Sequence, residues 1–524
     1  MGKASQRKIG SKEPTRVLQE IDFPPPHFLT RPLSVFLLLA VLATLIYSNT
    51  FSVPFIFDDV PNIVENPRIK DLRNFLDLSG SRYIGYLSFA LNYHFGNLSL
   101  FGYHLINLII HIANGFLVYL LVRLLFQTPS ISRGDWGETD RASWIALATA
   151  LLFVVHPIQT QAVTYIVQRL ASLATLFYLL SVVFYLKGRL PSADVRNKFF
   201  WCVLALLSTV LAMKTKEISF TLPIMLVLIE IVFFGTLDKE RMVFLIPFLL
   251  TLLVIPFSRL DVVGSIEEGF AQQTTVLSRS EYLFTEFRVI LTYLRLLLFP
   301  INQNLDYDYP VSHSSFEPSV LISLLFLLTL FAMSVYFVFV SSSTWLSLAG
   351  FGIFWFFLTL SVESSIIPIW DVIFEHRLYL PSVGFLMTLS MILFGGIRVK
   401  IRDKAAAILL LGVLLVFSVA TYKRNIVWGE ELTLWQDVVT KSPGSQRGHN
   451  NLGAFLSKKG ELDKAAFHYS KALEINPRFA EAHHNLANTL AKQGRLEEAV
   501  QHYLQALQIN PGLAQARERL VMLI

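Results

Sequence analysis

Two adjacent carboxylates, Asp58 and Asp59, follow directly on an apolar run in the stretch FIFDDVPNIVENP. Further ionisable side chains stand beside other apolar runs: His156, Arg169, Lys216, Glu217, Glu375, His376 and Arg377. A carboxylate can remove a proton from a hydroxyl, and nearby cations can stabilise the charge on a departing phosphate. Together these residue types predict a site for group transfer, with Asp58 and Asp59 as candidate bases, the cations as phosphate ligands, and Glu375, Glu217 and His156 in support.

Each of these residues also has a structural interpretation. A carboxylate pair outside a helix can be a solvated loop, and His156 before Pro157 can simply end a helix. Lys216 and Glu217 can form a local ion pair, and Arg169 can extend from its helix to lipid headgroups. Asp306 and Asp308, which alternate with tyrosines in NLDYDYP, are interpreted as structural.

The elements that position these residues are expected to be membrane helices. The chain has 524 residues, of which 53% are hydrophobic and 16% are charged, well below the roughly 25% charged residues of soluble domains. Apolar runs of near-spanning length recur through to about residue 422. We predict an all-α, polytopic membrane protein with eleven spans, near 34–50, 101–126, 143–155, 168–187, 199–213, 218–234, 242–257, 318–341, 345–361, 379–396 and 405–422.

Charge asymmetry predicts the orientation of these helices. Lys and Arg gather in the N-terminal tail, in the loop Lys187 to Lys198, around Lys239 and Arg241, and in the loop Arg398 to Lys404. Placing them all on the cytoplasmic side puts Asp58, Asp59 and the C-terminus outside. Glu281 to Phe299 is apolar but carries Glu286, Arg288 and Arg295, so we expect a helix at the outer interface rather than a span.

Past residue 422 the chain changes character. NNLGAFLSKKGELDKAAFHYSKALEINP from Asn450 recurs as HNLANTLAKQGRLEEAVQHYLQALQINP from His484, a period of 34 residues with matching Gly, Ala, Tyr and Pro positions. Small residues at these places let paired helices approach, which is the tetratricopeptide pattern. Stacked helix pairs form a concave surface that can hold a peptide or a protein, and Asn451 and Asn485 occupy equivalent positions as candidate partner-binding residues.

The predicted domains follow from these patterns. Residues 1–32 form a disordered cytoplasmic tail, and residues 33–422 form the membrane domain, with a first external loop at 51–100 and an interfacial region at 258–317. Residues 423–524 form an external repeat domain, with repeats near 446–479 and 480–513, a partial repeat before them and a cap helix after them.

Several other chemistries lack their usual sequence signatures. The chain has no GK[ST] phosphate loop, HExxH, Cys-x-x-Cys or GxSxG motif, so soluble nucleotide hydrolysis and zinc hydrolysis fit poorly. We predict no metal site, and the sequence leaves a requirement for a divalent ion open. Its one cysteine, Cys202, excludes an intrachain disulfide framework.

Taken together, the motifs resemble one family, the transmembrane, tetratricopeptide-repeat-containing O-mannosyltransferases. The resemblance rests on FIFDDVPNIVENP, FGYHLINLIIH, HPIQTQAV with VQRLASL, KTKEISFTLP, NLDYDYP, EHRLYLPSVGF and the repeat tail, in that order. It covers the chain from about residue 50 to the end.

The resemblance implies a GT-C glycosyltransferase that uses a polyprenyl-phosphate sugar on the external or lumenal face. It places the catalytic base in the acidic pair, and we assign Asp58 as the base, with Asp59 orienting it. Arg377 with His376 would bind the donor phosphate, and Lys216 and Arg169 are second candidates for that task. The expected reaction inverts the configuration at a hexose, which the family implies is mannose, and the expected acceptor is a protein hydroxyl.

Two other functions stay open at this point. One is a noncatalytic scaffold whose repeats recruit partners to an envelope glycan machine, and the other is a transporter or flippase. A transporter would favour ionisable residues near mid-membrane and an inverted repeat, neither of which the sequence displays. The short repeat array favours a bacterial inner membrane over the endoplasmic reticulum as the location.

Overall fold

The computed structural model describes residues 31–78, 80–132, 140–190, 194–235, 238–260, 277–369, 371–394 and 400–524. The described residues form helices and connecting segments without a strand, which confirms the all-α prediction. Most of the expected tail at 1–32, part of the interfacial region 258–317 and part of the basic loop Arg398 to Lys404 lie outside the described residues.

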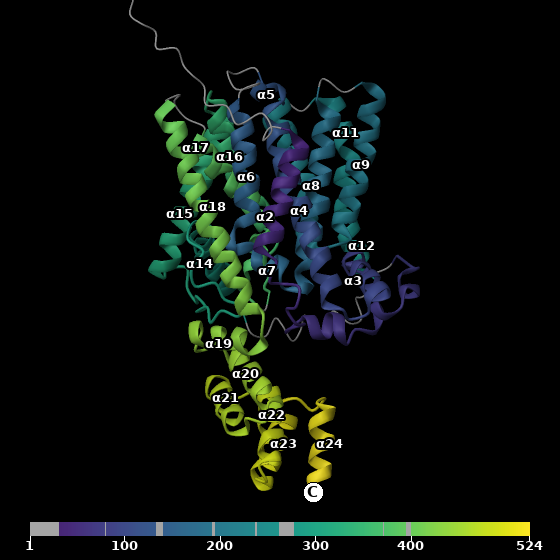
Figure 1. Cartoon of the computed structure of the whole chain (residues 1–524), viewed down its shortest axis with the longest axis vertical. Coiled ribbons are helices and arrows are strands. Elements are labelled where there is room, and N and C mark those ends of the chain that lie inside the picture. Colours follow the sequence, from purple (N-terminus) through teal and green to yellow (C-terminus); the bar gives the residue numbers. More distant parts are fainter. Residues whose placement is uncertain are drawn as a thin grey trace, which may run out of the picture.

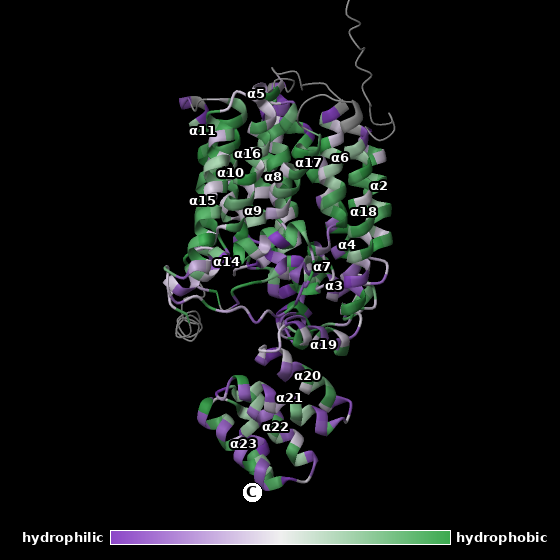
Figure 2. Cartoon of the chain, turned by 90° about the vertical axis from the view of Figure 1, so that its left-hand side faces the viewer, coloured by the Kyte–Doolittle hydropathy of each residue, from purple (hydrophilic) through white to green (hydrophobic). Residues whose placement is uncertain are grey.

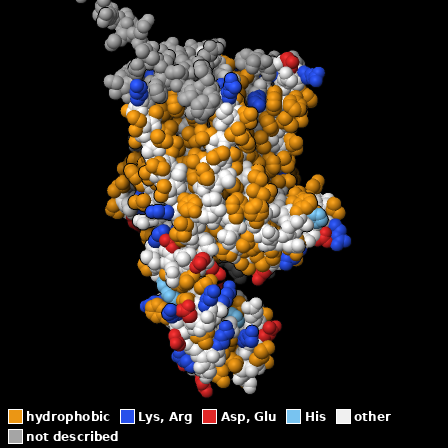
Figure 3. Space-filling model, in the orientation of Figure 1, with side chains coloured by type: hydrophobic (Ala, Val, Ile, Leu, Met, Phe, Trp, Pro, Cys, Tyr) orange, Lys and Arg blue, Asp and Glu red, His pale blue; other side chains and the backbone are white. Residues whose placement is uncertain are grey.

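A bundle of long apolar helices makes up the membrane domain (Figure 1). Figure 2 shows the hydrophobic bundle above the more hydrophilic helices at the C-terminus, and Figure 3 shows an apolar belt with charged side chains at both ends. The helices of the bundle are α2 (Pro32–Ile46), α4 (Leu100–Phe126), α6 (Asp140–Val155), α8 (Arg169–Arg189), α9 (Val195–Met213), α10 (Leu222–Ile229), α11 (Lys239–Leu250), α12 (Val254–Leu260), α15 (Pro318–Phe339), α16 (Thr344–Leu360), α17 (Pro381–Phe394) and α18 (Lys400–Trp428).

Among the described residues, seven helical segments are long and apolar enough to cross a membrane, and a bent pair makes up to eight. Three shorter apolar helices, α2, α16 and α17, accompany them. The bent pair is α6 with the segment Pro157–Val163, at an angle of 50°. The break falls at Pro157, which cannot donate a helical hydrogen bond. These helices make the chain a multi-pass membrane protein.

Two predicted spans differ from the helices that form. The first was expected to reach residue 50, but α2 ends at Ile46 and the chain then turns. The last was expected to end at residue 422, but α18 continues to Trp428. There, buried Trp428 lies against Tyr165, with ring centroids 5.4 Å apart, so tertiary packing extends the helix past its apolar run.

Several further helices, most of them short, gather at the end of the bundle that carries the repeats, which we call the repeat-side end (Figure 1). One of them, α14, has a capping box at Ser278 and is not among the candidate spans, in line with its predicted interfacial position. They are η1 (Val60–Val64), η2 (Pro67–Lys70), η3 (Leu72–Phe75), α3 (Tyr83–Gly96), η4 (Pro157–Gln159), α7 (Thr160–Val163), η5 (Ile166–Gln168), η6 (Glu217–Thr221), α14 (Arg279–Leu298) and η9 (Glu375–Leu378). At the opposite end lies α5 (Pro129–Ser132), and η7 (Glu230–Phe234) and η8 (Thr251–Leu253) continue bundle helices.

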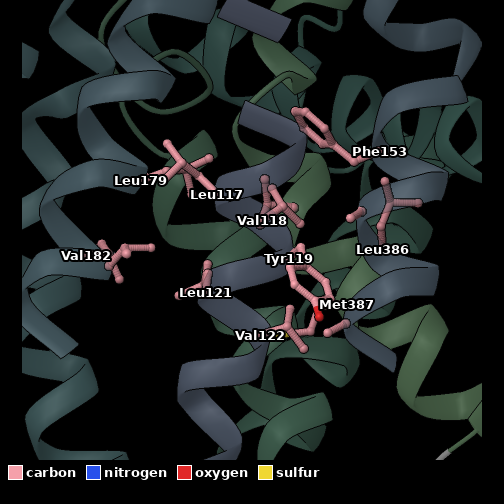
Figure 4. Close-up of a cluster of buried hydrophobic side chains, with 14 of the residues drawn as sticks. Leu117, Val118, Tyr119, Leu121, Val122, Phe153, Leu179, Val182, Leu386 and Met387 are labelled. Carbon is pink, nitrogen blue, oxygen red and sulfur yellow. The ribbon is translucent and has the colours of Figure 1, made fainter. Parts of the chain in front are cut away.

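The core of the bundle is centred on α4. Its side chains Leu117, Val118, Leu121 and Val122 are buried and share one hydrophobic cluster with residues of α6, α8 and α17 (Figure 4). Because α4 contacts several neighbours at once, it fixes the positions of the short helices that follow α6 and precede α8.

Helices α16 and α17 approach closely because glycines face each other. A Cβ at Gly384 would lie 2.3 Å from the carbonyl oxygen of Gly352, closer than such atoms can come. We therefore expect Gly384→Ala to destabilise the protein by about 1–3 kcal/mol, the usual cost of overpacking. Thermal unfolding in detergent measures the change.

The matched control is Gly412→Ala on α18, where an added Cβ would meet nothing within 4 Å. An unfolding temperature for Gly384→Ala equal to that of Gly412→Ala would contradict the close approach of α16 and α17.

Six helices form the repeat domain. They are α19 (Glu431–Lys441), α20 (Gln446–Lys458), α21 (Leu462–Ile475), α22 (Ala480–Lys492), α23 (Leu496–Ile509) and α24 (Ala514–Leu523). Gly460 and Gly494 adopt φ of +83° and +80° in the turns between paired helices, a conformation that glycine tolerates. Ala465, Tyr469 and Ala472 are buried between the helices, as are their equivalents one repeat later.

Candidate active site

The acidic pair lies in the first loop at the repeat-side end, and its two members have different surroundings. Asp59 is 1% exposed, and its carboxylate accepts hydrogen bonds from the backbone N–H of Val167, at 2.7 Å, and of Ile56, at 3.2 Å. Burial raises the pKa of Asp59 to about 8, while these N–H donors lower it in part. Asp59 therefore ties the loop to η5, and its oxygens are occupied.

Asp58 is only half-buried. Its backbone N–H donates to the hydroxyl of Tyr165 at 2.9 Å, and its backbone oxygen accepts from the side chain of Asn62 at 2.8 Å. Burial raises the pKa of the Asp58 carboxyl; the Tyr165 hydroxyl lowers it, the charge of Asp371 raises it and that of Arg447 lowers it. The loop thus holds Asp58 by its backbone and leaves the side chain in a partly open position, as a base requires.

Arg377 organises a neighbouring loop. Its guanidinium is buried and donates to the backbone oxygens of Val372, at 3.0 Å, Asp371, at 2.5 Å, and Glu363, at 3.5 Å. It also lies 3.9 Å from the carboxylate of Glu286. These contacts shape the segment that brings Asp371 towards Asp58, so Arg377 has a structural task besides any contact with phosphate.

Lys216 and Glu217 do not pair with each other, as one interpretation of the sequence held. The Nζ atom of Lys216 lies 2.8 Å from a carboxylate oxygen of Glu363, and Glu217 binds Arg82 at 3.1 Å. Arg82 and Glu217 line an open pocket whose other walls include the apolar side chains Phe220, Ile224, Ile255 and Ile367. A pocket with charge at one side and apolar walls suits an amphiphile.

His376 lies among these cations. Its backbone N–H donates to the side-chain oxygen of Gln161 at 2.7 Å, and its ring Nδ1 lies 3.1 Å from the same atom. Burial, followed by the charges of Lys216, Arg377 and Arg82, lowers the pKa of the His376 imidazole well below its usual value. The ring is therefore neutral at physiological pH and offers a hydrogen bond rather than a charge.

Arg169 is fully buried, so its side chain does not extend from its helix towards lipid, as one interpretation of the sequence held. Its guanidinium donates four hydrogen bonds, to the side chains of Asn107 and Asn92 and the backbone oxygens of Ser88 and Tyr103. It also stacks over the ring of Phe89, 4.7 Å from the centroid. With its donors engaged inside the protein, Arg169 joins α3, α4 and α8 and is poorly placed to bind a donor phosphate.

Glu375 and His156 hold neighbouring segments together. The Glu375 carboxylate accepts from the backbone N–H of Asn304, at 2.6 Å, the hydroxyl of Tyr307, at 2.7 Å, and the side chain of Gln303, at 2.8 Å. The ring of His156 accepts from the backbone N–H of Ile158 and contacts the Leu297 carbonyl at 2.9 Å. Both side chains therefore hold backbone segments in place.

The repeats present a groove on one face. Asn485 lines it together with Tyr469, Tyr503, Lys458 and Arg519, and donates to the side chain of Asn450 at 3.0 Å. Asn451, the position equivalent to Asn485, is half-buried and is not among the residues lining this groove. Of the two candidate partner-binding residues, the structure brings Asn485 to the groove.

Three charged residues of the site were not singled out from the sequence. Arg82 adopts a left-handed backbone, with φ of 57°, and reaches Glu217 from α3. Asp371 and Arg447 pair with each other beside Asp58. The available signals were weak: Arg82 precedes a helix expected at the interface, and Arg447 follows the turn at Pro443 between α19 and α20.

No group of three or more His, Cys, Asp or Glu side chains that could hold a metal ion occurs within the part of the chain that the structure describes. The candidate site comprises the carboxylate of Asp58 and a set of paired cations at the same end of the bundle.

The chain is similar to repeat families and to known proteins. A tetratricopeptide repeat family model matches residues 480–513, and a TPR repeat model matches residues 456–494. A protein O-mannosyl-transferase of Caenorhabditis elegans is 27% identical over 475 residues, covering 85% of this chain and 63% of that protein. Protein O-mannosyl-transferase Tmtc3 of Drosophila melanogaster is 25% identical and covers 85% of this chain and 55% of its own length. Protein O-mannosyl-transferase TMTC3 of Homo sapiens is also 25% identical and covers 84% of this chain and 51% of its own length.

The chain therefore spans less than two thirds of the length of these relatives. Among solved structures, the crystal structure of ArnT from Cupriavidus metallidurans bound to undecaprenyl phosphate aligns over 91% of this chain and 80% of that one, with a TM-score of 0.44 and 13% identity. The chain is therefore similar to protein O-mannosyl-transferases over about 85% of its length, and its C-terminal part matches tetratricopeptide repeats.

Proposed function

We propose that the chain is an inverting membrane glycosyltransferase of the GT-C type. It moves a hexose, mannose by similarity to its relatives, from a polyprenyl-phosphate carrier to a protein Ser or Thr hydroxyl. The reaction takes place at the repeat-side end, which faces the external side of the membrane. The observation that carries the proposal is Asp58: a half-buried carboxylate with a raised pKa, at the same end as the cations and the repeats.

In this mechanism Asp58 accepts the proton of the acceptor hydroxyl as its oxygen attacks the anomeric carbon. The bond from that carbon to the phosphate oxygen breaks, and polyprenyl phosphate leaves with the bonding electrons. Direct displacement inverts the configuration. A base whose pKa lies above that of an ordinary carboxyl holds the transferred proton better, which favours Asp58 over a solvated carboxylate.

We propose that Lys216 and Arg82 bind the phosphate of the sugar donor. His376 would contribute a hydrogen bond as a neutral group. Lys216 pairs with Glu363 and Arg82 pairs with Glu217, and a phosphate would replace or join these carboxylates. The apolar walls beside Arg82 suit the first isoprene units of the carrier. Arg377 supports this site by holding the loop that carries Glu363 and Asp371.

The repeats support a polypeptide acceptor or a docked protein, because stacked helix pairs form an extended binding surface. The external face of a bacterial inner membrane, with the N-terminus in the cytoplasm, fits the distribution of Lys and Arg.

The test is transfer of labelled hexose by the purified full chain, with synthetic polyprenyl-phosphate mannose and, separately, polyprenyl-phosphate glucose as donors. We expect transfer to hydroxyl-containing membrane proteins from the mannose donor. A folded protein that transfers from neither donor would contradict the proposed reaction and favour a noncatalytic scaffold.

Lys216→Gln tests the donor side. We expect it to raise the KM for the donor roughly 10-fold to 100-fold, because a charged hydrogen bond to phosphate contributes about 1.5–3 kcal/mol. Lys216→Arg should retain most of the affinity, and Lys464→Gln, an exposed lysine of the repeats, is the control of equal charge change. An unchanged KM in Lys216→Gln would remove Lys216 from donor binding.

A further inference from the structure

Arg447 joins the repeat domain to the loop that faces Asp58. It lies on α20, the first helix of the first complete repeat, and its guanidinium binds the carboxylates of both Asp306 and Asp371. The same guanidinium lies over the ring of Phe57, 5.6 Å from the centroid. Phe57 directly precedes Asp58 in the chain, so one side chain of the repeats contacts both the loop of the candidate base and Asp371, whose charge acts on Asp58.

These contacts are enclosed rather than superficial. Asp306 is 6% exposed and also accepts a hydrogen bond from the Ser445 hydroxyl, while the Arg447 and Asp371 side chains are each 24% exposed. Charges in such surroundings are screened less by solvent than charges on an open surface. The charge of Arg447 therefore acts on its neighbours over several ångströms.

Several contacts besides those of Arg447 attach the repeats. The Nζ atom of Lys441 donates to the backbone oxygen of Gln303 at 2.8 Å, and Asn304 donates to the Ser442 hydroxyl at 2.8 Å. Arg424 of α18 pairs with Asp437 of α19 at 2.6 Å. Because these contacts lie elsewhere on the same junction, the repeats should stay docked when the Arg447 charge is removed.

We propose that Arg447 is a positioning residue that the repeat domain contributes to the transfer site: it holds Asp371 and Phe57 in place and balances the negative charge around Asp58. This inference rests on the proposed function. It means that the repeats complete the environment of the base as well as offering a surface to the acceptor.

The sign of the effect follows from the groups that face Asp58. These are Asp59 and Tyr165 behind it, Tyr86 from α3, Asp371 from the loop after α16, and Arg447. Arg447 is the cation among them, and it lowers the pKa of Asp58, whereas Asp371 raises it. Without Arg447 the base would need a higher pH to lose its proton, and without Asp371 a lower one.

The experiment measures the pH profile of kcat/KM for sugar transfer by the full chain. We expect Arg447→Gln to move the acid limb of the profile up by roughly one pH unit and Asp371→Asn to move it down. Arg447→Lys should restore most of the wild-type profile, and the double variant should lie between the single ones. Arg478→Gln, an exposed arginine of the repeats, is the control of equal charge change and should leave the limb in place.

The outcomes separate this inference from the reaction on which it rests. Active, folded Arg447→Gln and Asp371→Asn proteins with an unmoved acid limb would overturn the inference and leave the proposed function intact. If Arg447→Gln does not fold, Asp371→Asn still tests the inference. An acid limb that does not move down in this variant would overturn it. A folded wild type without transfer would overturn the proposed function and this inference with it.

Discussion

Asp58→Asn is expected to lower kcat for sugar transfer by roughly 10²-fold to 10⁴-fold, the usual contribution of a general base. The amide has the shape of the carboxylate but cannot accept the proton. The fold should survive, because the backbone hydrogen bonds of residue 58, to the Tyr165 hydroxyl and from the Asn62 side chain, do not depend on its carboxylate. Transfer of labelled sugar per folded molecule measures the effect.

The same experiment separates the two members of the acidic pair. Asp59→Asn should reduce the yield of folded protein, because the amide NH₂ replaces an oxygen that accepts a backbone N–H from Val167 or Ile56. Glu65→Gln, at an exposed position of the same loop, is the control that should change neither property. Wild-type kcat in Asp58→Asn would remove Asp58 from the mechanism.

Arg169→Met is expected to cost at least about 3 kcal/mol of stability. The substitution removes four hydrogen bonds from a charged group and leaves Asn107, Asn92 and two backbone oxygens without that partner in a buried place. It also removes the cation from the face of Phe89. Unfolding in detergent by heat or denaturant measures the loss.

Arg196→Met, at an exposed position on α9, removes the same charge without removing a buried network. We expect its unfolding to match that of the wild type. If Arg169→Met were as stable as wild type and instead had a raised KM for the donor, Arg169 would bind the donor phosphate and the structural role would be wrong.

Much of the fold could be predicted because membrane helices and repeats are encoded locally. Apolar runs of near-spanning length correspond to the bundle helices, and the 34-residue period with its Gly and Pro positions predicts the paired helices α20 to α23. The region of the candidate site could also be predicted, since charge bias and the position of Asp58 and Asp59 beside an apolar run placed them at the repeat-side end. In both the prediction and the structure, Asp58 and Asp59 lie at the same end of the bundle as the repeats.

The roles of individual side chains depended on partners far away in the chain. Asp58 and Asp59 are equivalent by composition, and they differ because Val167, 108 residues away, donates its N–H to Asp59. Arg169 and Arg82 both stand beside apolar runs, yet Arg169 is buried among satisfied partners and Arg82 lines an open pocket. Periodicity and composition do not encode such pairings, because they depend on which loops the packed helices bring together.

What the sequence by itself determined was the class of the protein: a helical membrane bundle with an acidic pair after its first apolar run, and a short repeat array at the C-terminal end of the given sequence. Only the tertiary structure decided which carboxylate is left partly open, which arginines are committed to the core, and that Arg447 reaches Asp371 beside Asp58. The physical reason is that hydrophobic burial depends on a pattern of apolar residues that is visible along the sequence. Hydrogen bonds and ion pairs depend on which atoms lie close together in the folded chain.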